Sequence, residues 1–137
     1  MSETFTLRLK PETTESLARH AKRSGTAPRT LAQRYVEEGL RRDDHPLVDF
    51  ADGPSGRRAK LVGRGLDVWE VIATVRDNDN DLAEASDYLG IPIGLVEAAL
   101  GYYGAFRDEI DEQIALNEEE SARGYAAWEA GQRALER

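Results

Sequence analysis

The chain has 137 residues, of which 40% are hydrophobic and 32% are charged, and its formal net charge at pH 7 is −8. This length suffices for one ordinary domain or two small ones. The lack of cysteine excludes disulfides and thiolate metal sites, and no apolar run is long enough for a membrane span or a signal peptide. We therefore expect a cytoplasmic protein.

The charge is unevenly distributed along the chain. Residues 1–42 contain nine Lys or Arg side chains and five acids, a net charge of +4, so the other 95 residues carry −12. This asymmetry predicts a basic module that faces an anion and an acidic part that faces another partner.

The first predicted element is a strand over residues 3–9, where apolar and polar side chains alternate strictly. Its apolar face comprises Phe5, Leu7 and Leu9, and its polar face comprises Thr4, Thr6 and Arg8. Pro11 ends the run before a partner strand can follow, so we expect antiparallel pairing with a second chain. Such a ribbon fits the DNA major groove, where hydroxyl and guanidinium groups read base edges. The alternative is an edge strand in the chain's own sheet.

Two helices follow the strand. The first is predicted from Pro11 to Ser24, before Gly25, and the second from about Thr26 to Arg42 with Thr26 as its N-cap. The second helix carries apolar or small residues that we expect to form a single buried face: Leu31, Ala32, Tyr35, Val36, Gly39 and Leu40.

Residues 43–46 are predicted to be a linker, and residues 47–50 and 59–62 a hairpin around a turn at 52–56. A helix from Val68 is expected to end at the polar stretch 77–81, with Asn80 or Asp81 capping the next helix. Residues 82–104, interrupted at Gly90, have the outline of a helix-turn-helix.

The presumed recognition helix of this motif, from Pro92 onward, carries no Lys or Arg, which favours packing or dimerisation over DNA reading. A group of cationic residues near the hairpin either forms a wing that contacts DNA or lies on a solvated edge strand, where its charges prevent aggregation. Its members are Arg57, Arg58, Lys60 and Arg64.

From Phe106 onward the chain is predicted to be a helical tail with few apolar residues. Gly124 and Gly131 each cost a helix interior about 1 kcal/mol relative to alanine, so the tail alone is expected to fray and to become ordered on a partner. Tyr125 and Trp128 are residue types that dominate interfaces, and the alternative is that they pack on the middle domain.

The sequence offers few residues for catalysis or metal binding. The two histidines lie on different predicted elements, and the spacing of Asp77, Asp79 and Asp81 lacks the later ligands of a calcium loop. We expect no enzyme, no metal site and no cofactor.

The strand, helix, Gly25 and helix of residues 3–42 resemble the ribbon-helix-helix repressors of the MetJ, Arc and CopG kind. The resemblance implies an intertwined dimer whose paired strands read the major groove while the start of the second helix holds a phosphate. By position, the implied DNA-binding residues are Thr4, Thr6, Arg8, Lys10, Thr26 and Arg29. Pro28 departs from the family pattern because it removes one amide at the phosphate site.

Residues 46–107 resemble the small domain catalogued as domain of unknown function four-three-three, which is common in proteins assigned as antitoxins. The resemblance lies in residues 57–63, 66–69 and 95–103, although the usual Gly-Thr-Arg is here Gly63-Arg-Gly65. The whole chain thus resembles a VapB-type antitoxin, which implies a PIN-like ribonuclease toxin and operator DNA as partners.

The expected fold is mainly α with short β elements, in three parts. Residues 1–45 form an intertwined ribbon-helix-helix dimer, 46–107 a hairpin plus helix-turn-helix domain, and 108–137 a toxin-binding helical tail. The expected toxin-binding residues are Leu116, Arg123, Tyr125, Trp128, Arg133 and Leu135, with Arg123 or Arg133 entering the toxin's acidic site. The alternatives are a stand-alone regulator with a ligand-sensing or dimerising middle domain, and a purely dimerising adaptor.

Overall fold

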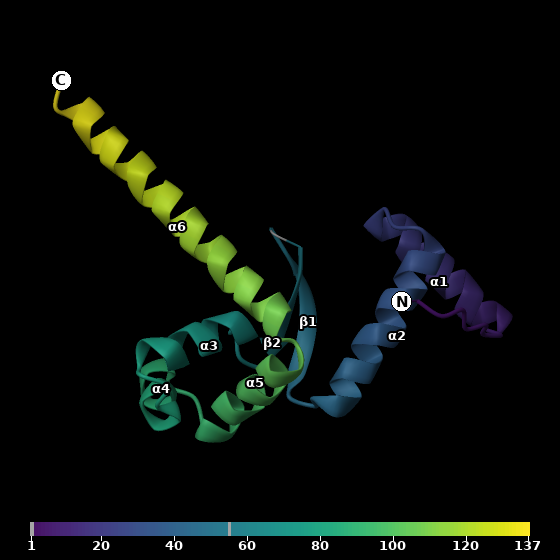
Figure 1. Cartoon of the computed structure of the whole chain (residues 1–137). Coiled ribbons are helices and arrows are strands. Elements are labelled where there is room, and N and C mark those ends of the chain that lie inside the picture. Colours follow the sequence, from purple (N-terminus) through teal and green to yellow (C-terminus); the bar gives the residue numbers. More distant parts are fainter. Residues whose placement is uncertain (1, 55) are drawn as a thin grey trace. The chain divides into compact units, whose positions relative to one another are not determined.

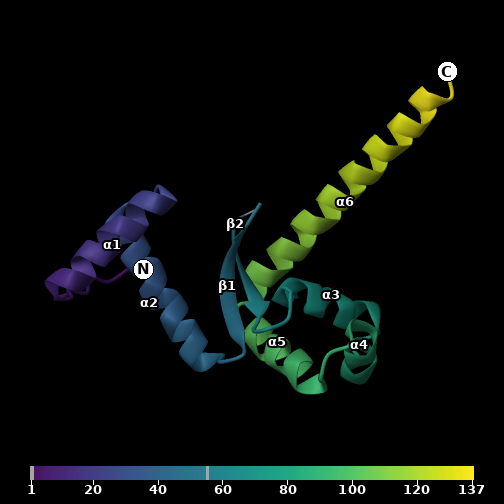
Figure 2. The same ribbon diagram turned by 180° about the vertical axis from the view of Figure 1, so that it is seen from behind.

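The computed structural model describes residues 2–54 and 56–137. It is mainly helical with one antiparallel sheet of two strands (Figure 1, and from behind in Figure 2), as expected for the fold class. The chain divides into two compact units, Met1–Asp43 and Asp44–Arg137, called unit 1 and unit 2 below. None of the helices in the described residues is long and apolar enough to cross a membrane.

Unit 1 contains two helices joined at a glycine. Helix α1 spans Pro11–Ser24 and helix α2 spans Pro28–Asp44, so α2 continues through the first half of the predicted linker. Proline is tolerated in the first turn of a helix because its missing amide would have no intrahelical partner there. Helix α1 ends where Gly25 adopts a left-handed conformation with φ of 65°, which glycine accepts more readily than other residues.

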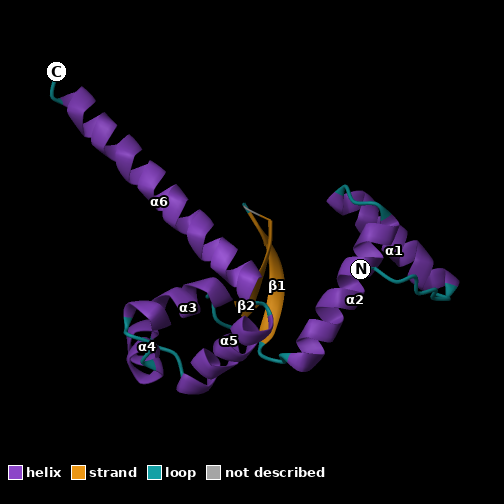
Figure 3. Cartoon of the chain, viewed as in Figure 1, coloured by secondary structure: helices purple, strands orange, loops and turns teal. Residues whose placement is uncertain are grey.

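The N-terminal segment before α1 forms neither helix nor strand over the described residues 2–10 (Figure 3). The sheet in the described part of the chain contains only two later strands, so the segment is not an edge strand of that sheet. Its pairing with a second chain stays a prediction.

Unit 1 has a very small apolar core. Among its described residues, the buried apolar side chains are those of Ala21 and Leu31. The expectation that one face of α2 is buried is wrong for the single chain, because Tyr35, Val36 and Leu40 are 44%, 49% and 59% exposed.

Unit 2 begins with the hairpin. Strand β1 spans Val48–Gly53 and strand β2 spans Gly56–Leu61, and they pair antiparallel from Val48 opposite Leu61 to Gly53 opposite Gly56. The strands extend further toward the turn than predicted, and Ser55 of the predicted turn lies outside the described residues. Because side chains alternate along a strand, Val48, Ala59 and Leu61 reach the core together.

Four helices complete unit 2: α3 at Val68–Asp77, α4 at Leu82–Leu89, α5 at Ile93–Ala105 and α6 at Arg107–Leu135. As predicted, Asp81 caps α4, accepting a hydrogen bond from the Glu84 amide at 3.1 Å, and α4 ends at a left-handed Gly90. The buried Tyr102 side chain of α5 contacts the Phe106 ring at a tilted angle, with centroids 4.7 Å apart, and meets the His45 ring edge-on. Unit 2 therefore has its own continuous core.

Polar contacts fasten the hairpin to α3. The Arg58 Nε group donates to Asp67 Oδ1 at 3.0 Å, and the Trp69 indole donates to Asp67 Oδ2 at 3.1 Å. The backbone amide of Asp67 donates to Glu70 Oε1 at 3.1 Å at the start of the helix. Asp67 is buried, so these donors compensate the cost of removing its carboxylate from water.

Helix α6 is one continuous helix of 29 residues, which differs from the frayed tail expected from sequence. It leaves the other elements of unit 2 in both views (Figure 1; Figure 2). Ile110 and Ile114 are its buried side chains among the described residues, so only the first two turns belong to the core.

Candidate functional site

The predicted base-reading residues lie in the exposed N-terminal segment. Thr4, Thr6, Arg8 and Lys10 are all exposed, and the structure neither joins them to one another nor covers them. The alternate side chains Phe5, Leu7 and Leu9 are 83%, 55% and 44% exposed. Both faces of the predicted strand are therefore accessible to a partner.

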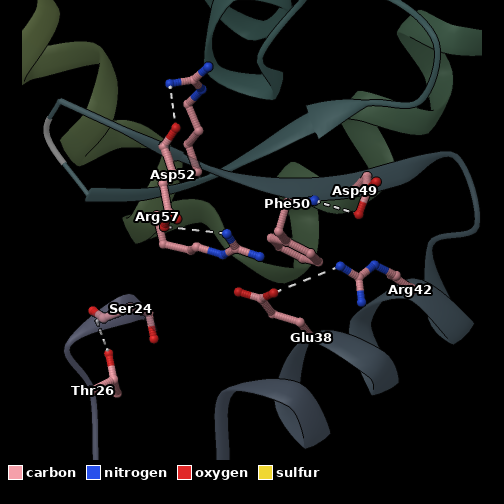
Figure 4. A network of polar contacts seen from close by, with 9 residues as sticks. Ser24, Thr26, Glu38, Arg42, Asp49, Phe50, Asp52 and Arg57 are labelled. Carbon is pink, nitrogen blue, oxygen red and sulfur yellow. Dashed lines mark hydrogen bonds and ion pairs between the residues drawn. The ribbon is translucent and has the colours of Figure 1, made fainter. Parts of the chain in front are cut away.

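The predicted phosphate-binding residues lie at the start of α2. Because α2 begins at Pro28, Thr26 is not its N-cap as predicted, and the Thr26 hydroxyl donates to the Ser24 carbonyl oxygen at 3.3 Å (Figure 4). Arg29 is exposed in the first turn of α2. A helix N-terminus with an exposed cation beside it suits an anion.

Unit 1 thus presents two uncovered apolar surfaces. One is the odd-numbered face of the N-terminal segment and the other is the stripe on α2. The exposed side chains are Phe5, Leu7, Leu9, Tyr35, Val36 and Leu40. Exposed apolar surface of this kind is typical of interaction sites.

Two of the four hairpin cations form ion pairs within unit 2. Arg57 bonds Asp52 at 3.3 Å (Figure 4) and Arg58 bonds Asp67 at 3.0 Å. Lys60 lies opposite Asp49 in the strand register. These acids reduce the positive potential of the hairpin, so the geometry favours the protected edge over the DNA wing.

Helix α5, the second helix of the predicted helix-turn-helix, is a core element. Its side chains Val96, Ala99 and Tyr102 are buried against the other elements of unit 2. A helix with this packing and no Lys or Arg is poorly suited to a DNA groove.

Sequence reasoning missed a polar cluster that joins three helices. Arg76 of α3 donates to the Tyr103 hydroxyl of α5 and to Asp111 of α6, and that hydroxyl donates to Asp111 Oδ1 at 2.8 Å. The Arg76 guanidinium also lies 5.5 Å from the Tyr103 ring centroid. No sequence signal connects these residues, because α3, α5 and α6 meet only in the folded unit.

This cluster shifts the proton affinities of its charged members. The hydrogen bond from Tyr103, followed by that from Arg76, lowers the pKa of Asp111 below its ordinary value of 3.8. The hydrogen bond to Asp111 in turn raises the pKa of Arg76.

The predicted toxin-binding residues lie on the part of α6 beyond its buried turns. Tyr125, Trp128 and Leu135 are 62%, 59% and 82% exposed, so the alternative of packing on the middle domain is not found. Leu116 and Arg123 are also exposed, and Arg133 Nη1 lies 3.6 Å from Glu129 Oε2.

A hollow of about 490 Å³ lies among α3, α4 and α5 of unit 2. Apolar side chains and the polar groups of Arg76, Asn80, Tyr103 and Arg107 line it. The apolar lining residues are Ile72, Val75, Leu82 and Leu100.

No family model, curated protein or solved structure matches this chain. Functional inference therefore depends on the residues and geometry described above.

The lowered pKa of Asp111 gives a prediction for acid unfolding. A carboxylate whose folded pKa is depressed adds stability above its unfolded pKa, and this stability is lost as the pH falls through the folded value. Asp111→Asn should therefore be less stable than wild type above pH 3.8, and the difference should shrink below that pH. Urea unfolding between about pH 2 and pH 7 measures it.

Asp87→Asn, at an exposed position of α4, is the matched control and should keep the wild-type pH dependence. If the free energies of unfolding of Asp111→Asn and wild type differ by the same amount across this pH range, the cluster does not hold the Asp111 carboxylate in its charged form.

Proposed function

We propose that the chain is a homodimeric, DNA-binding antitoxin that represses its own operon and neutralises a PIN-like ribonuclease toxin. The observation that carries this proposal is the exposed, alternating segment at residues 3–9, followed by α1, Gly25 and α2. Its apolar face needs a cover that the described part of the chain does not supply, and a second copy supplies an identical strand.

DNA binding is supported by the charge and exposure of unit 1. In the paired ribbon, Thr4, Thr6 and Arg8 face the base edges, and Lys10 lies beside the backbone. Thr26 and Arg29 approach a phosphate from the start of α2. The net charge of +4 over residues 1–42 attracts DNA although the whole chain is acidic.

Toxin binding is supported by the exposure of the outer part of α6. Tyr125 and Trp128 provide apolar anchors, and Leu116 and Leu135 extend the apolar contact. The proposed mechanism is occlusion, in which α6 covers the toxin's active site. A guanidinium from Arg123 or Arg133 then pairs with carboxylates there, since Arg forms two parallel hydrogen bonds with a carboxylate.

A second candidate is a stand-alone regulator whose unit 2 senses a ligand. The hollow of about 490 Å³ favours this candidate, because its volume and apolar lining are in the usual range for small-molecule sites. Arg76 and Arg107 border the hollow, and Asp111 pairs with both of them, so their charge is partly compensated there.

The DNA-binding proposal predicts different effects for two arginines. Arg8→Ala should lower specific affinity by about 1–3 kcal/mol and relax the base preference, because it removes a base contact. Arg29→Ala should weaken binding to all sequences alike and flatten the salt dependence, because it removes a phosphate contact. Gel-shift titrations with the chain's own upstream DNA at several salt concentrations measure both.

Arg123→Ala, which removes the same charge from α6, is the matched control and should bind DNA as wild type does. If all three variants lose the same small amount of DNA affinity, the assignment of Arg8 and Arg29 as DNA-binding residues is wrong.

The toxin proposal predicts that truncation after Leu116 abolishes neutralisation and leaves DNA binding intact. The truncated chain keeps Ile110 and Ile114 and therefore its core. Co-expression with the product of the adjacent gene, followed by purification and a growth assay, measures complex formation and neutralisation. If the truncated chain still neutralises the toxin, the interface lies in the rest of unit 2. If the full-length chain forms no complex with the product of the adjacent gene, the result favours the stand-alone regulator.

A further inference from the structure

The hollow among α3, α4 and α5 has an apolar base. Ile72 and Val75 of α3 are 2% and 4% exposed, and both line the hollow. Leu82 of α4 and Leu100 of α5 complete its apolar lining. These four side chains provide a surface on which the apolar body of a small organic molecule can pack.

The polar side chains that border the hollow have hydrogen-bond donors to spare. Arg76 uses Nη2 for its bonds to Tyr103 and Asp111, and Arg107 approaches Asp111 through Nε at 3.7 Å. The other N–H groups of these two guanidiniums have no hydrogen-bond partner in the described part of the chain. None of the described residues that line the hollow is acidic. A ligand at this border must therefore supply acceptors.

The chain's own Asp111 shows that a carboxylate fits between these donors. Its Oδ1 accepts from Arg76 and from the Tyr103 hydroxyl at 2.8 Å, and its Oδ2 lies 3.7 Å from Arg107 Nε. Two guanidiniums and one carboxylate leave a net charge of +1. The side chains of Arg76 and Arg107 are 42% and 74% exposed, so a second anion can reach them.

The border near Asn80 is less suitable for an anion. Asp79 and Asp81 flank Asn80 in the sequence, and Asp81 caps α4 through the Glu84 amide. These two carboxylates repel an anionic group beside Asn80. An anion in the hollow is therefore drawn to the two arginines.

We propose that the hollow binds a small monocarboxylate with an apolar body. The carboxylate of the ligand accepts hydrogen bonds from the N–H groups of Arg76 and Arg107 that Asp111 does not use. Its body packs on the four apolar side chains. The residual charge of +1 matches a single anion, and a guanidinium forms two parallel hydrogen bonds with a planar carboxylate.

This inference rests on the second candidate function, since it names the class of ligand that the hollow of unit 2 takes. It does not depend on DNA or toxin binding. The experiment below separates an error in the ligand class from the absence of a ligand site.

NMR titration of the full-length chain tests the inference at about pH 7, with the methyl groups of leucine labelled. The ligands are octanoate, octanamide and octylamine, which share one chain and differ in the charge of the head group. Octanoate should shift the methyl signals of Leu82 and Leu100 and bind about 10-fold more tightly than octanamide, because its hydrogen bonds are charge-assisted. The chain's net charge of −8 attracts cations in general, so a preference for octanoate over octylamine must come from local groups.

Arg107→Gln should lower the affinity for octanoate by about 10-fold and leave that for octanamide unchanged, because it removes a charged donor from the border of the hollow. The Arg107 side chain is exposed, so its replacement leaves the core of unit 2 intact. Arg123→Gln removes the same charge from the outer part of α6 and is the matched control. It should bind all three ligands as wild type does.

Three results would overturn the inference. Equal affinities for octanoate and octanamide would show that the hollow takes apolar molecules without recognising an anion. Equal losses for Arg107→Gln and Arg123→Gln would show general attraction between charges instead of a contact at the hollow. If none of the three ligands shifts the signals of Leu82 and Leu100, the hollow is not a ligand site, and the second candidate function loses the observation that favours it.

Discussion

The apolar side chains of unit 1 have too little of their own chain to cover them. Ala21 and Leu31 are its buried apolar residues in the described part, while Phe5, Leu7 and Leu9 remain exposed before α1. A unit of 43 residues is near the size, about 40 residues, below which folding usually needs a second subunit or another support. The proposed dimerisation through the N-terminal segment would satisfy this need, and it would also create the ribbon that the DNA-binding proposal requires.

Unit 2 differs from unit 1 because it encloses a core of its own, and only the outer part of α6 lies outside that core. Asp67 holds the hairpin to α3, and the cluster of Arg76, Tyr103 and Asp111 joins α3, α5 and α6 within this unit. The outer part of α6 contributes nothing to that core. Its aromatic pair, Tyr125 and Trp128, is therefore exposed in the single chain, as the proposed interface requires.

Local signals in the sequence predicted much of this fold. Gly25, Gly90 and Asp81 end or begin helices where expected, because each acts on the backbone within a few residues. The exposure of the apolar face of α2 was not predictable. The spacing of its apolar residues is the same for a face buried within the chain and for a face buried only by a second protein. The contact between Arg76 and Asp111 was not predictable either, because it forms only where helices α3, α5 and α6 meet in the folded unit.

The antiparallel pairing of the N-terminal segments is the central claim, and distances between spin labels test it most directly. Labels are attached to single cysteines introduced at Thr4, Thr6 and Arg8, which lie on the proposed outer face. In an antiparallel ribbon the distance between equivalent labels is shortest at the strand centre and grows by about 7 Å for each residue away from it, twice the rise per residue. The same short distance at all three positions, or no short distance at any, would contradict the account.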